Sequence, residues 1–203
     1  MPSLSVVEQI ASLPKTDRDE ILAGLTDEQA EELLYDWRGF TARPDQIAPD
    51  GDWDIWLALA GRGWGKTRTG AEWVRERVNA GAKRIALIAE TQKDLEEVMV
   101  GGESGILSVF PPSERPTVRF KPVRLTFPNG AIALGYNATE PGQLRGPQFD
   151  TAWCDELAKW RYARETWDML QFGMRLGDPK VMVTTTPTPT ELVKALVAGQ
   201  EGK

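Results

Sequence analysis

The sequence predicts an α/β fold in which a doubly wound, mostly parallel sheet is sandwiched between helices. Three observations lead to this expectation. Apolar runs too unbroken for half-exposed strands alternate with helical patterns, a glycine-rich turn joins one such run to a helix, and an acidic pair directly follows another run. With 203 residues, of which 41% are hydrophobic, the chain is long enough to bury a core of this kind.

The first 40 residues are predicted to form short helices that pack as an arm without chemistry of their own. Leu4, Val7 and Ile10 share one face at helical spacing, and Thr26 with Gln29 makes a capping box. The helix after that box carries apolar residues at the i, i+3, i+4 and i+7 positions, namely Ala30, Leu33, Leu34 and Trp37. We therefore expect a helical arm at 1–40 and one larger domain at 41–203.

The larger domain is expected to alternate strands and helices. Buried parallel strands are predicted at residues 55–60, 84–89, 151–154 and 181–183, and helices at 66–79, 91–100 and 162–175. Three short β-prone runs interrupt this alternation, at 118–120, 124–127 and 132–136. The sequence Pro128-Asn129-Gly130 between the last two runs is a strong hairpin signal. We predict an antiparallel β-hairpin insertion at the sheet edge.

The composition excludes several classes of protein. Cys154 is the only cysteine and histidine is absent, which excludes an intrachain disulfide, zinc enzymes, and Ser-His or Cys-His hydrolases. The net charge of -6 argues against an electrostatic grip on nucleic acid over the whole surface, so a DNA contact must be local or shared. No apolar run approaches the roughly 20 residues that cross a bilayer, and acids stand where a secretory signal is basic. We expect a cytoplasmic protein without membrane contact.

A phosphate-binding loop follows the first predicted strand. It has the P-loop form, with alanine at the first position, and reads Ala60-Gly61-Arg62-Gly63-Trp64-Gly65-Lys66-Thr67. Small residues let backbone N–H groups face an anion at the start of a helix, where the helix dipole adds favourable potential. We expect Lys66 to reach the β and γ phosphates of a nucleotide and the Thr67 hydroxyl to bind Mg²⁺.

An acidic pair completes the predicted site. Asp155 and Glu156 are the only adjacent carboxylates that directly follow a buried-strand pattern. We expect Asp155 to support the Mg²⁺ shell and Glu156 to orient and deprotonate the attacking water. A water-activating glutamate favours nucleotide hydrolysis over passive binding or transfer to another substrate.

The order of several motifs resembles the large terminase subunits of tailed bacteriophages and gene transfer agents, over residues 35 to 200 approximately. The motifs are ARPDQ at 42–46, GRGWGKT at 61–67, FPNG at 127–130, QLRGPQFDTAWCDE at 143–156 and VTTTPTPTE at 183–191. The resemblance implies an additional-strand, RecA-like ATPase that uses ATP and Mg²⁺ to translocate double-stranded DNA into a capsid. It also implies three partners: a capsid portal, a small terminase subunit and other copies of this chain. The copies are expected to form a ring, and the resemblance implies that this ring is a pentamer.

The resemblance also assigns residues outside the loop and the acidic pair. Gln46 matches a glutamine that contacts adenine, and Arg62 matches a loop arginine that contacts the γ phosphate or switches with nucleotide state, in cis or in trans. Arg145 matches an arginine finger that reaches the ATP of the neighbouring subunit. The hydroxyl-rich turn at 184–187, from which we select Thr185 as a site residue, matches a coupling motif that senses the γ phosphate. The nuclease domain usual in this family has no counterpart in residues 188–203.

Two other functions remain open on the sequence alone. A helicase-like DNA translocase shares a glutamine before the loop and an Asp-Glu pair, but it needs a second RecA-like domain. A non-catalytic module, in which ATP binding alone stabilises a ring, is compatible with the acidic composition. The helicase-like translocase predicts strand separation by the purified domain. The non-catalytic module predicts that Glu156→Gln leaves assembly and function unchanged.

Aromatic and basic residues raise the question of nucleic-acid contacts. We expect core packing for all tryptophans except Trp64, which lies in the phosphate loop: Trp37, Trp53, Trp56, Trp73, Trp153, Trp160 and Trp167. If DNA touches this domain, the candidates are Arg119, Lys121 and Arg124 on the predicted hairpin, where alternate side chains face one side.

Overall fold

The computed structural model describes residues 6–200, and the chain divides into two compact units between Pro49 and Asp50. The predicted position of Leu4 lies outside the described residues. The first unit includes the segment 41–49, which the sequence analysis assigned to the larger domain. In the described residues, no helix is both long and apolar enough to span a bilayer.

The first unit is helical. Its elements are α1 (Val6–Ser12), α2 (Lys15–Ala23), α3 (Asp27–Tyr35), the π-helical turn η1 (Trp37–Thr41) and the 3-10 turn η2 (Pro44–Gln46). The predicted capping box of α3 is confirmed, because Gln29 N–H donates to Thr26 Oγ1 (3.2 Å) and Thr26 N–H donates to Gln29 Oε1 (3.0 Å). The expectation that Trp37 belongs to the same helix is wrong. The helix ends at Tyr35, and the Asp36 side chain accepts the Gly39 N–H to begin η1.

The second unit is built on one seven-stranded sheet with the order β1-β7-β6-β2-β5-β4-β3. The strands are β1 (Ile55–Leu59), β2 (Arg84–Ala89), β3 (Thr117–Phe120), β4 (Val123–Thr126), β5 (Ile132–Asn137), β6 (Thr151–Asp155) and β7 (Lys180–Thr185). Strands β1, β7, β6, β2 and β5 pair in parallel, whereas β3 and β4 pair antiparallel. The predicted α/β class, mostly parallel sheet and edge hairpin are confirmed.

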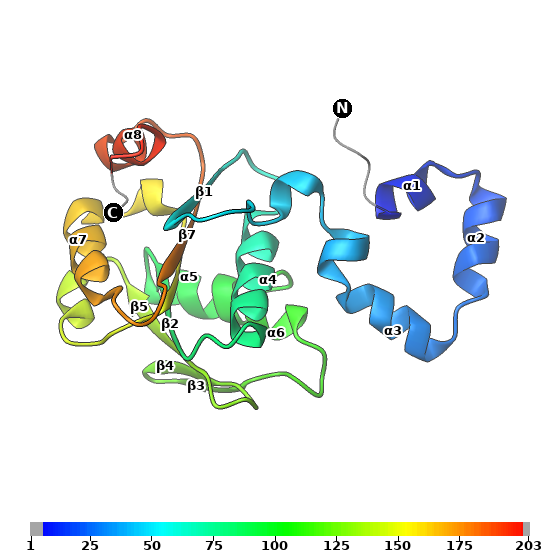
Figure 1. The fold of residues 1–203 in the computed structure, drawn as a ribbon, viewed down its shortest axis with the longest axis horizontal. Coiled ribbons are helices and arrows are strands. Elements are labelled where there is room, and N and C mark those ends of the chain that lie inside the picture. Colours follow the sequence, from blue (N-terminus) through cyan, green and yellow to red (C-terminus); the bar gives the residue numbers. More distant parts are fainter. Residues whose placement is uncertain (1–5, 201–203) are drawn as a thin grey trace. The chain divides into compact units, whose positions relative to one another are not determined.

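Helices and short turns connect the strands. They are α4 (Lys66–Asn79), α5 (Gln92–Asp94), η3 (Leu95–Val100), α6 (Ile106–Val109), η4 (Pro141–Leu144), η5 (Leu157–Lys159), α7 (Ala163–Gly173) and α8 (Glu191–Val197). Helix α4 has the predicted bounds. The predicted helix at 91–100 begins as α5 and continues as the π-helical η3. Figure 1 traces these elements along the chain, from cyan to red.

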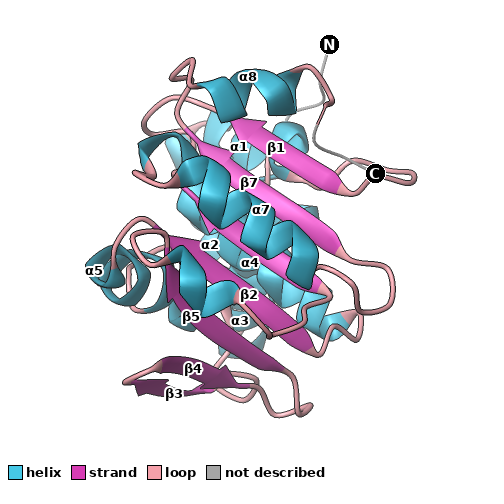
Figure 2. Cartoon of the chain, turned by 90° about the vertical axis from the view of Figure 1, so that its left-hand side faces the viewer, coloured by secondary structure: helices cyan, strands magenta, loops and turns pink. Residues whose placement is uncertain are grey.

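Helices cover the two faces of the parallel strands. Figure 2 shows α7 in front of the sheet and α4 behind it. The core on the α7 side joins Trp167 and Leu170 to Ala152, Cys154 and residues of α8. Of the tryptophans expected in the core, Trp53 and Trp56 are only half-buried, and the other five are buried.

The third predicted run of the insertion, β5, differs from expectation. It pairs antiparallel with β4 through the predicted Asn129-Gly130 turn, and Gly130 has a φ of 82°. Its other edge pairs in parallel with β2, with Ile132 beside Arg84. A turn motif predicts that the two strands it joins pair with each other, but it does not predict which strand pairs with the other edge of the second strand. The hairpin insertion at the edge therefore consists of β3 and β4, and β5 belongs to the parallel body.

Candidate functional site

The phosphate-binding loop connects β1 to α4 and ends at a helix N-terminus. Gly63 and Gly65 have φ values of 79° and 93°, in the left-handed region that favours glycine, and Gly65 is the N-cap of α4. Lys66 is the first residue of the helix and is buried. Its Nζ donates to the carbonyl oxygens of Ala60 (3.0 Å) and Gly61 (3.1 Å). The lysine ammonium is thus held inside the curve of its own loop, at the N-terminus of α4.

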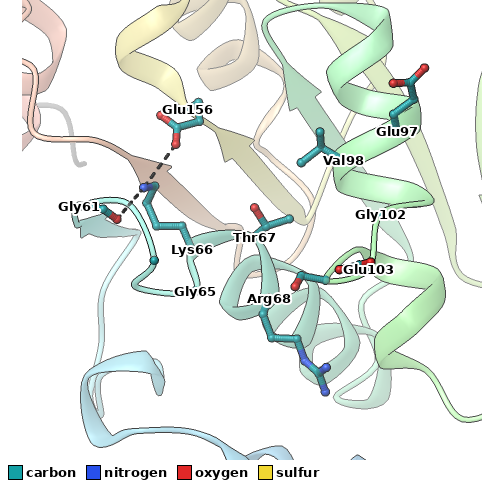
Figure 3. A pocket seen from close by; sticks show the side chains of 12 residues that line it. Gly61, Gly65, Lys66, Thr67, Arg68, Glu97, Val98, Gly102, Glu103 and Glu156 are labelled. Atoms are coloured by element: carbon teal, nitrogen blue, oxygen red, sulfur yellow. Dashed lines mark hydrogen bonds and ion pairs between the residues drawn. The ribbon is translucent and has the colours of Figure 1, made fainter.

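The acidic pair reaches the same place from the end of β6. Asp155 is the last residue of that strand, and Glu156 adopts a left-handed conformation with φ 49°. This unusual backbone turns the Glu156 carboxylate towards the loop, where its Oε1 lies 3.3 Å from Lys66 Nζ. Figure 3 shows the ammonium between the Gly61 carbonyl and the Glu156 carboxylate. The two predicted halves of the site therefore converge.

A buried set of side chains holds Asp155. Thr184 on β7 donates its hydroxyl to Asp155 Oδ1 (2.6 Å) and accepts the indole N–H of Trp153 (2.9 Å). A Cβ placed on Gly70 of α4 would overlap the Trp153 indole, with the ring Cε2 only 2.1 Å away. Glycine at 70 therefore lets α4 pack directly on the tryptophan that orients Thr184. The side chains of Trp153, Asp155 and Thr184 are almost fully buried.

A second hydroxyl holds Glu156 from the more open side. Thr186, which follows β7, donates to Glu156 Oε2 (3.0 Å), and Lys159 Nζ lies 3.7 Å from the same oxygen. Thr185 has a different environment, because its hydroxyl accepts the backbone N–H of Ala158 (2.9 Å). The residues on either side of Thr185 are thus the ones that touch the acids, and γ-phosphate sensing by Thr185 stays a prediction.

The two acids have opposite pKa shifts. Burial raises the pKa of Asp155 to about 6, although the hydrogen bond from Thr184 acts to lower it. Burial also acts to raise the pKa of Glu156, but the Lys66 ammonium and the hydrogen bond from Thr186 outweigh it, and the pKa is lowered. Near neutral pH, Glu156 is therefore firmly ionised, whereas Asp155 is close to its titration range.

Two adjoining pockets surround these groups. The larger one, of ≈ 490 Å³, is lined on one side by loop residues and on the other by Glu97, Val98 and the segment 102–104. The smaller one, of ≈ 250 Å³, is lined by Asp155 and by residues at the ends of β2 and α5. Thr67, Val98 and Glu156 line both. The two residues expected at a metal ion, Thr67 and Asp155, therefore face one cavity.

The remaining predicted residues differ in their environments. Arg62 is exposed in the loop, and Trp64 beside it is half-buried. Gln46 is buried in the first unit, where its Oε1 accepts the Arg43 N–H (3.1 Å). Arg145 is exposed directly after η4. Adenine contact by Gln46, phosphate contact by Arg62 and a finger role for Arg145 stay predictions.

The sequence analysis gave no site role to Gly70 or Trp153, and it named Thr184 and Thr186 only as members of the hydroxyl-rich turn. The run of three threonines drew attention to the end of β7, but it did not distinguish which hydroxyls face the acids. A glycine inside a helical pattern was the available signal for Gly70, because glycine there costs helix stability unless packing requires it.

The fold and this geometry define a class of protein. One strand, β7, lies between the strand that leads into the phosphate loop and the strand that carries the acids. This is the additional-strand arrangement of RecA-like P-loop NTPases. The chain belongs to the terminase large subunit family, since the family model described as "Terminase large subunit, T4likevirus-type, N-terminal" matches residues 57–201.

Solved structures of phage terminases share the fold. The ATPase domain of the large terminase of Thermus phage P74-26 superposes with a TM-score of 0.57 at 17% identity, covering 82% of this chain and 71% of that chain. The large terminase of a thermophilic bacteriophage gives a TM-score of 0.51 at 13% identity, covering 79% of this chain and 38% of that chain. No curated protein sequence matches this chain.

Proposed function

We propose that this chain is the ATP-hydrolysing motor domain of a DNA packaging terminase and couples hydrolysis to translocation of double-stranded DNA into a capsid. The observation that carries the proposal is the 3.3 Å approach of Lys66 Nζ to Glu156 Oε1 at the mouth of a glycine-lined pocket. A phosphate-binding cation and an ionised general base are the two groups that hydrolysis of a nucleotide requires. Membership of the terminase family supports DNA as the translocated substrate.

The residues of the pocket fit a magnesium-bound triphosphate. A Cβ on Gly61 or Gly63 would meet no atom within 4 Å, so both glycines open onto space that phosphate oxygens can occupy. The Thr67 hydroxyl and the Asp155 carboxyl, which face one cavity, are oxygen donors suited to Mg²⁺ and its water shell. The metal, when bound, would neutralise charge on the phosphates.

Each residue then has a defined task. Lys66 moves from its loop carbonyls to the β and γ phosphates, and this movement frees Glu156 from its ion pair. Glu156, held by Thr186, orients the attacking water and takes its proton. Asp155, oriented by the hydrogen bond from Thr184, would hold the hydration shell of the metal ion.

The proposal extends to assembly. Copies of this chain form a ring, which we expect to be a pentamer on a capsid portal with a small terminase subunit as a further partner. Arg145 of one subunit reaches the ATP of the next, where a planar cation stabilises charge on the transferring phosphoryl group by roughly 10³ to 10⁵ in rate. Arg62 contacts the γ phosphate, and Gln46 reads adenine through its side-chain amide.

The test is the ATPase rate as a function of protein concentration, for wild type, Glu156→Gln, Arg145→Ala and a mixture of the two variants. We expect the rate per subunit to rise with concentration, both variants to be inactive, and the mixture to recover activity. Recovery is expected because some interfaces unite an intact glutamate with an intact arginine. A mixture as inactive as its components would contradict a finger acting between subunits.

The same samples distinguish the rival functions. A helicase-like translocase would separate the strands of a duplex, whereas the motor leaves the duplex intact. A non-catalytic assembly module would form its ring and function unchanged with Glu156→Gln. The proposed motor function predicts that this variant binds ATP but does not hydrolyse it.

A further inference from the structure

The hairpin β3–β4 carries positive charge that nothing in the described chain neutralises. Residues 115–139 contain no acid and four basic residues, namely Arg115, Arg119, Lys121 and Arg124. No ion pair or hydrogen bond of these four side chains occurs within residues 6–200. By contrast, Arg68, Arg75 and Lys180 of the same unit all have carboxylate partners.

The pairing of the strands gathers two of these charges on one face. Arg119 lies directly opposite Arg124, and Thr117 lies opposite Thr126. All four side chains are exposed, whereas Val123 and Leu125, which alternate with them, are buried on the other face. Figure 2 shows this hairpin at the edge of the sheet, beyond α7. We call the exposed set Thr117, Arg119, Arg124 and Thr126 the outer hairpin face.

The outer hairpin face continues onto the parallel body of the sheet. Through the strand register, Thr126 lies beside Ile132, and Ile132 lies beside Arg84 of β2. Arg84 is exposed, and with Ile132 and Leu134 it lines a groove of ≈ 450 Å³ at this end of the strands. Three arginines, from β2, β4 and β3, therefore share one side of the sheet, with β5 between β2 and β4.

This arrangement costs stability unless an anion covers it. Like charges directly opposite one another on a strand pair are destabilising, and no carboxylate nearby offsets them. The outer hairpin face has hydroxyls beside its guanidinium groups but no aromatic side chain. Phe120 stands opposite Val123, at a position of the other face. A surface of this kind suits rows of phosphates rather than unpaired bases, which bind by stacking on aromatic rings.

We propose that the outer hairpin face, together with Arg84, is the surface on which this domain holds the phosphate backbone of double-stranded DNA. The proposal deepens the proposed function and rests on DNA being the substrate of the motor. Contacts of arginine and threonine with phosphate carry no sequence information, so the grip is independent of base sequence. A packaging motor must move along any sequence, which matches such a grip.

The test compares two variants that each remove two positive charges. Arg119→Ala/Arg124→Ala changes the outer hairpin face, and Arg164→Ala/Lys194→Ala removes exposed cations from α7 and α8 as the matched control. Binding of a fluorescent duplex of mixed sequence is measured from low to moderate salt. The hairpin variant should bind at least about tenfold more weakly at low salt, and the slope of log affinity against log salt should fall by about 2. The control variant should retain most of the affinity.

Four readouts decide the outcome. Equal binding by the hairpin and control variants, including weak binding by all forms, would overturn the proposal. So would tighter binding to single strands or to poly-glutamate than to the duplex. Melting temperature should stay equal or rise in Arg119→Ala/Arg124→Ala, because the substitution relieves repulsion. DNA-independent ATP hydrolysis is measured separately, so loss of DNA binding in a chain without ATPase activity would sustain this surface and refute the motor.

Discussion

The two sides of the site differ in how tightly their groups are held. On the buried side, Asp155 is fixed by Thr184, and Thr184 by Trp153, which packs on Gly70. On the open side, Glu156 is held by Thr186 and by the ammonium groups of Lys66 and Lys159. Buried hydrogen bonds in a low dielectric fix geometry, whereas half-exposed ion pairs exchange readily for a substrate. In the proposed mechanism, the buried side therefore fixes the geometry of the site and the open side carries the reacting groups.

The largest expected effect is on the open side. Glu156→Gln should lower the ATPase rate by about 10² to 10⁴, because the amide cannot accept the proton of the attacking water. The melting temperature should change little. Glu97→Gln is the matched control, since it removes a carboxylate that lines the same pocket. A comparable loss in both variants would mean that Glu156 has no special role.

On the buried side, Gly70→Ala should cost mainly stability. The new methyl group would overlap the Trp153 indole, and overpacking of this kind typically costs about 1 to 3 kcal/mol or more. Urea unfolding of Gly70→Ala, Trp153→Phe and the double variant measures the coupling. We expect the double variant to lose less than the two single losses combined, because the smaller ring makes room. If the two single losses of unfolding free energy simply add in the double variant, the two residues do not contact each other.

The raised pKa of Asp155 predicts a pH dependence of stability. Because folding raises this pKa from 3.8 to about 6, the folded state retains the proton where the unfolded state has lost it. The associated stability is complete below pH 3.8 and is lost as pH rises towards 6. Asp155→Asn avoids this loss and should be more stable than wild type at pH 8 by up to about 3 kcal/mol.

Denaturant unfolding of wild type and Asp155→Asn across this range checks the expectation. The difference should grow between pH 4 and pH 6 and stay constant above. A difference that does not vary with pH would mean that Asp155 is not shifted by burial.

The threonines give the smallest contrast. Thr184→Val leaves the buried indole N–H of Trp153 without its acceptor and should cost about 1 to 3 kcal/mol of stability. Thr186→Val removes a bond on the more open side and should cost less than about 1 kcal/mol, but it should lower the ATPase rate by loosening Glu156. Thermal unfolding and rates on both variants test the pair. Equal losses of stability in Thr184→Val and Thr186→Val would contradict the difference between the buried side and the open side.

Much of this arrangement follows from local sequence patterns. Helix α4 and strand β2 have their predicted bounds, because apolar periodicity and the glycine loop mark their ends directly. The approach of Lys66 to Glu156 was predictable from a shared strand-end position. Other features depend on contacts across the fold. Local sequence patterns do not predict the contact between Gly70 and Trp153, the parallel pairing of β5 with β2, or the left-handed backbone of Glu156.

The central claim is that the phosphate loop and the acidic pair close around one magnesium-bound ATP. Calorimetric titration of wild type, Glu156→Gln and Lys66→Ala with ATP and Mg²⁺ tests it most directly. We predict one site per chain, retained in Glu156→Gln and weakened at least about tenfold in Lys66→Ala, which lacks the phosphate-binding cation. Absence of heat and affinity in the wild-type protein, or equal affinity in Lys66→Ala, would contradict the claim.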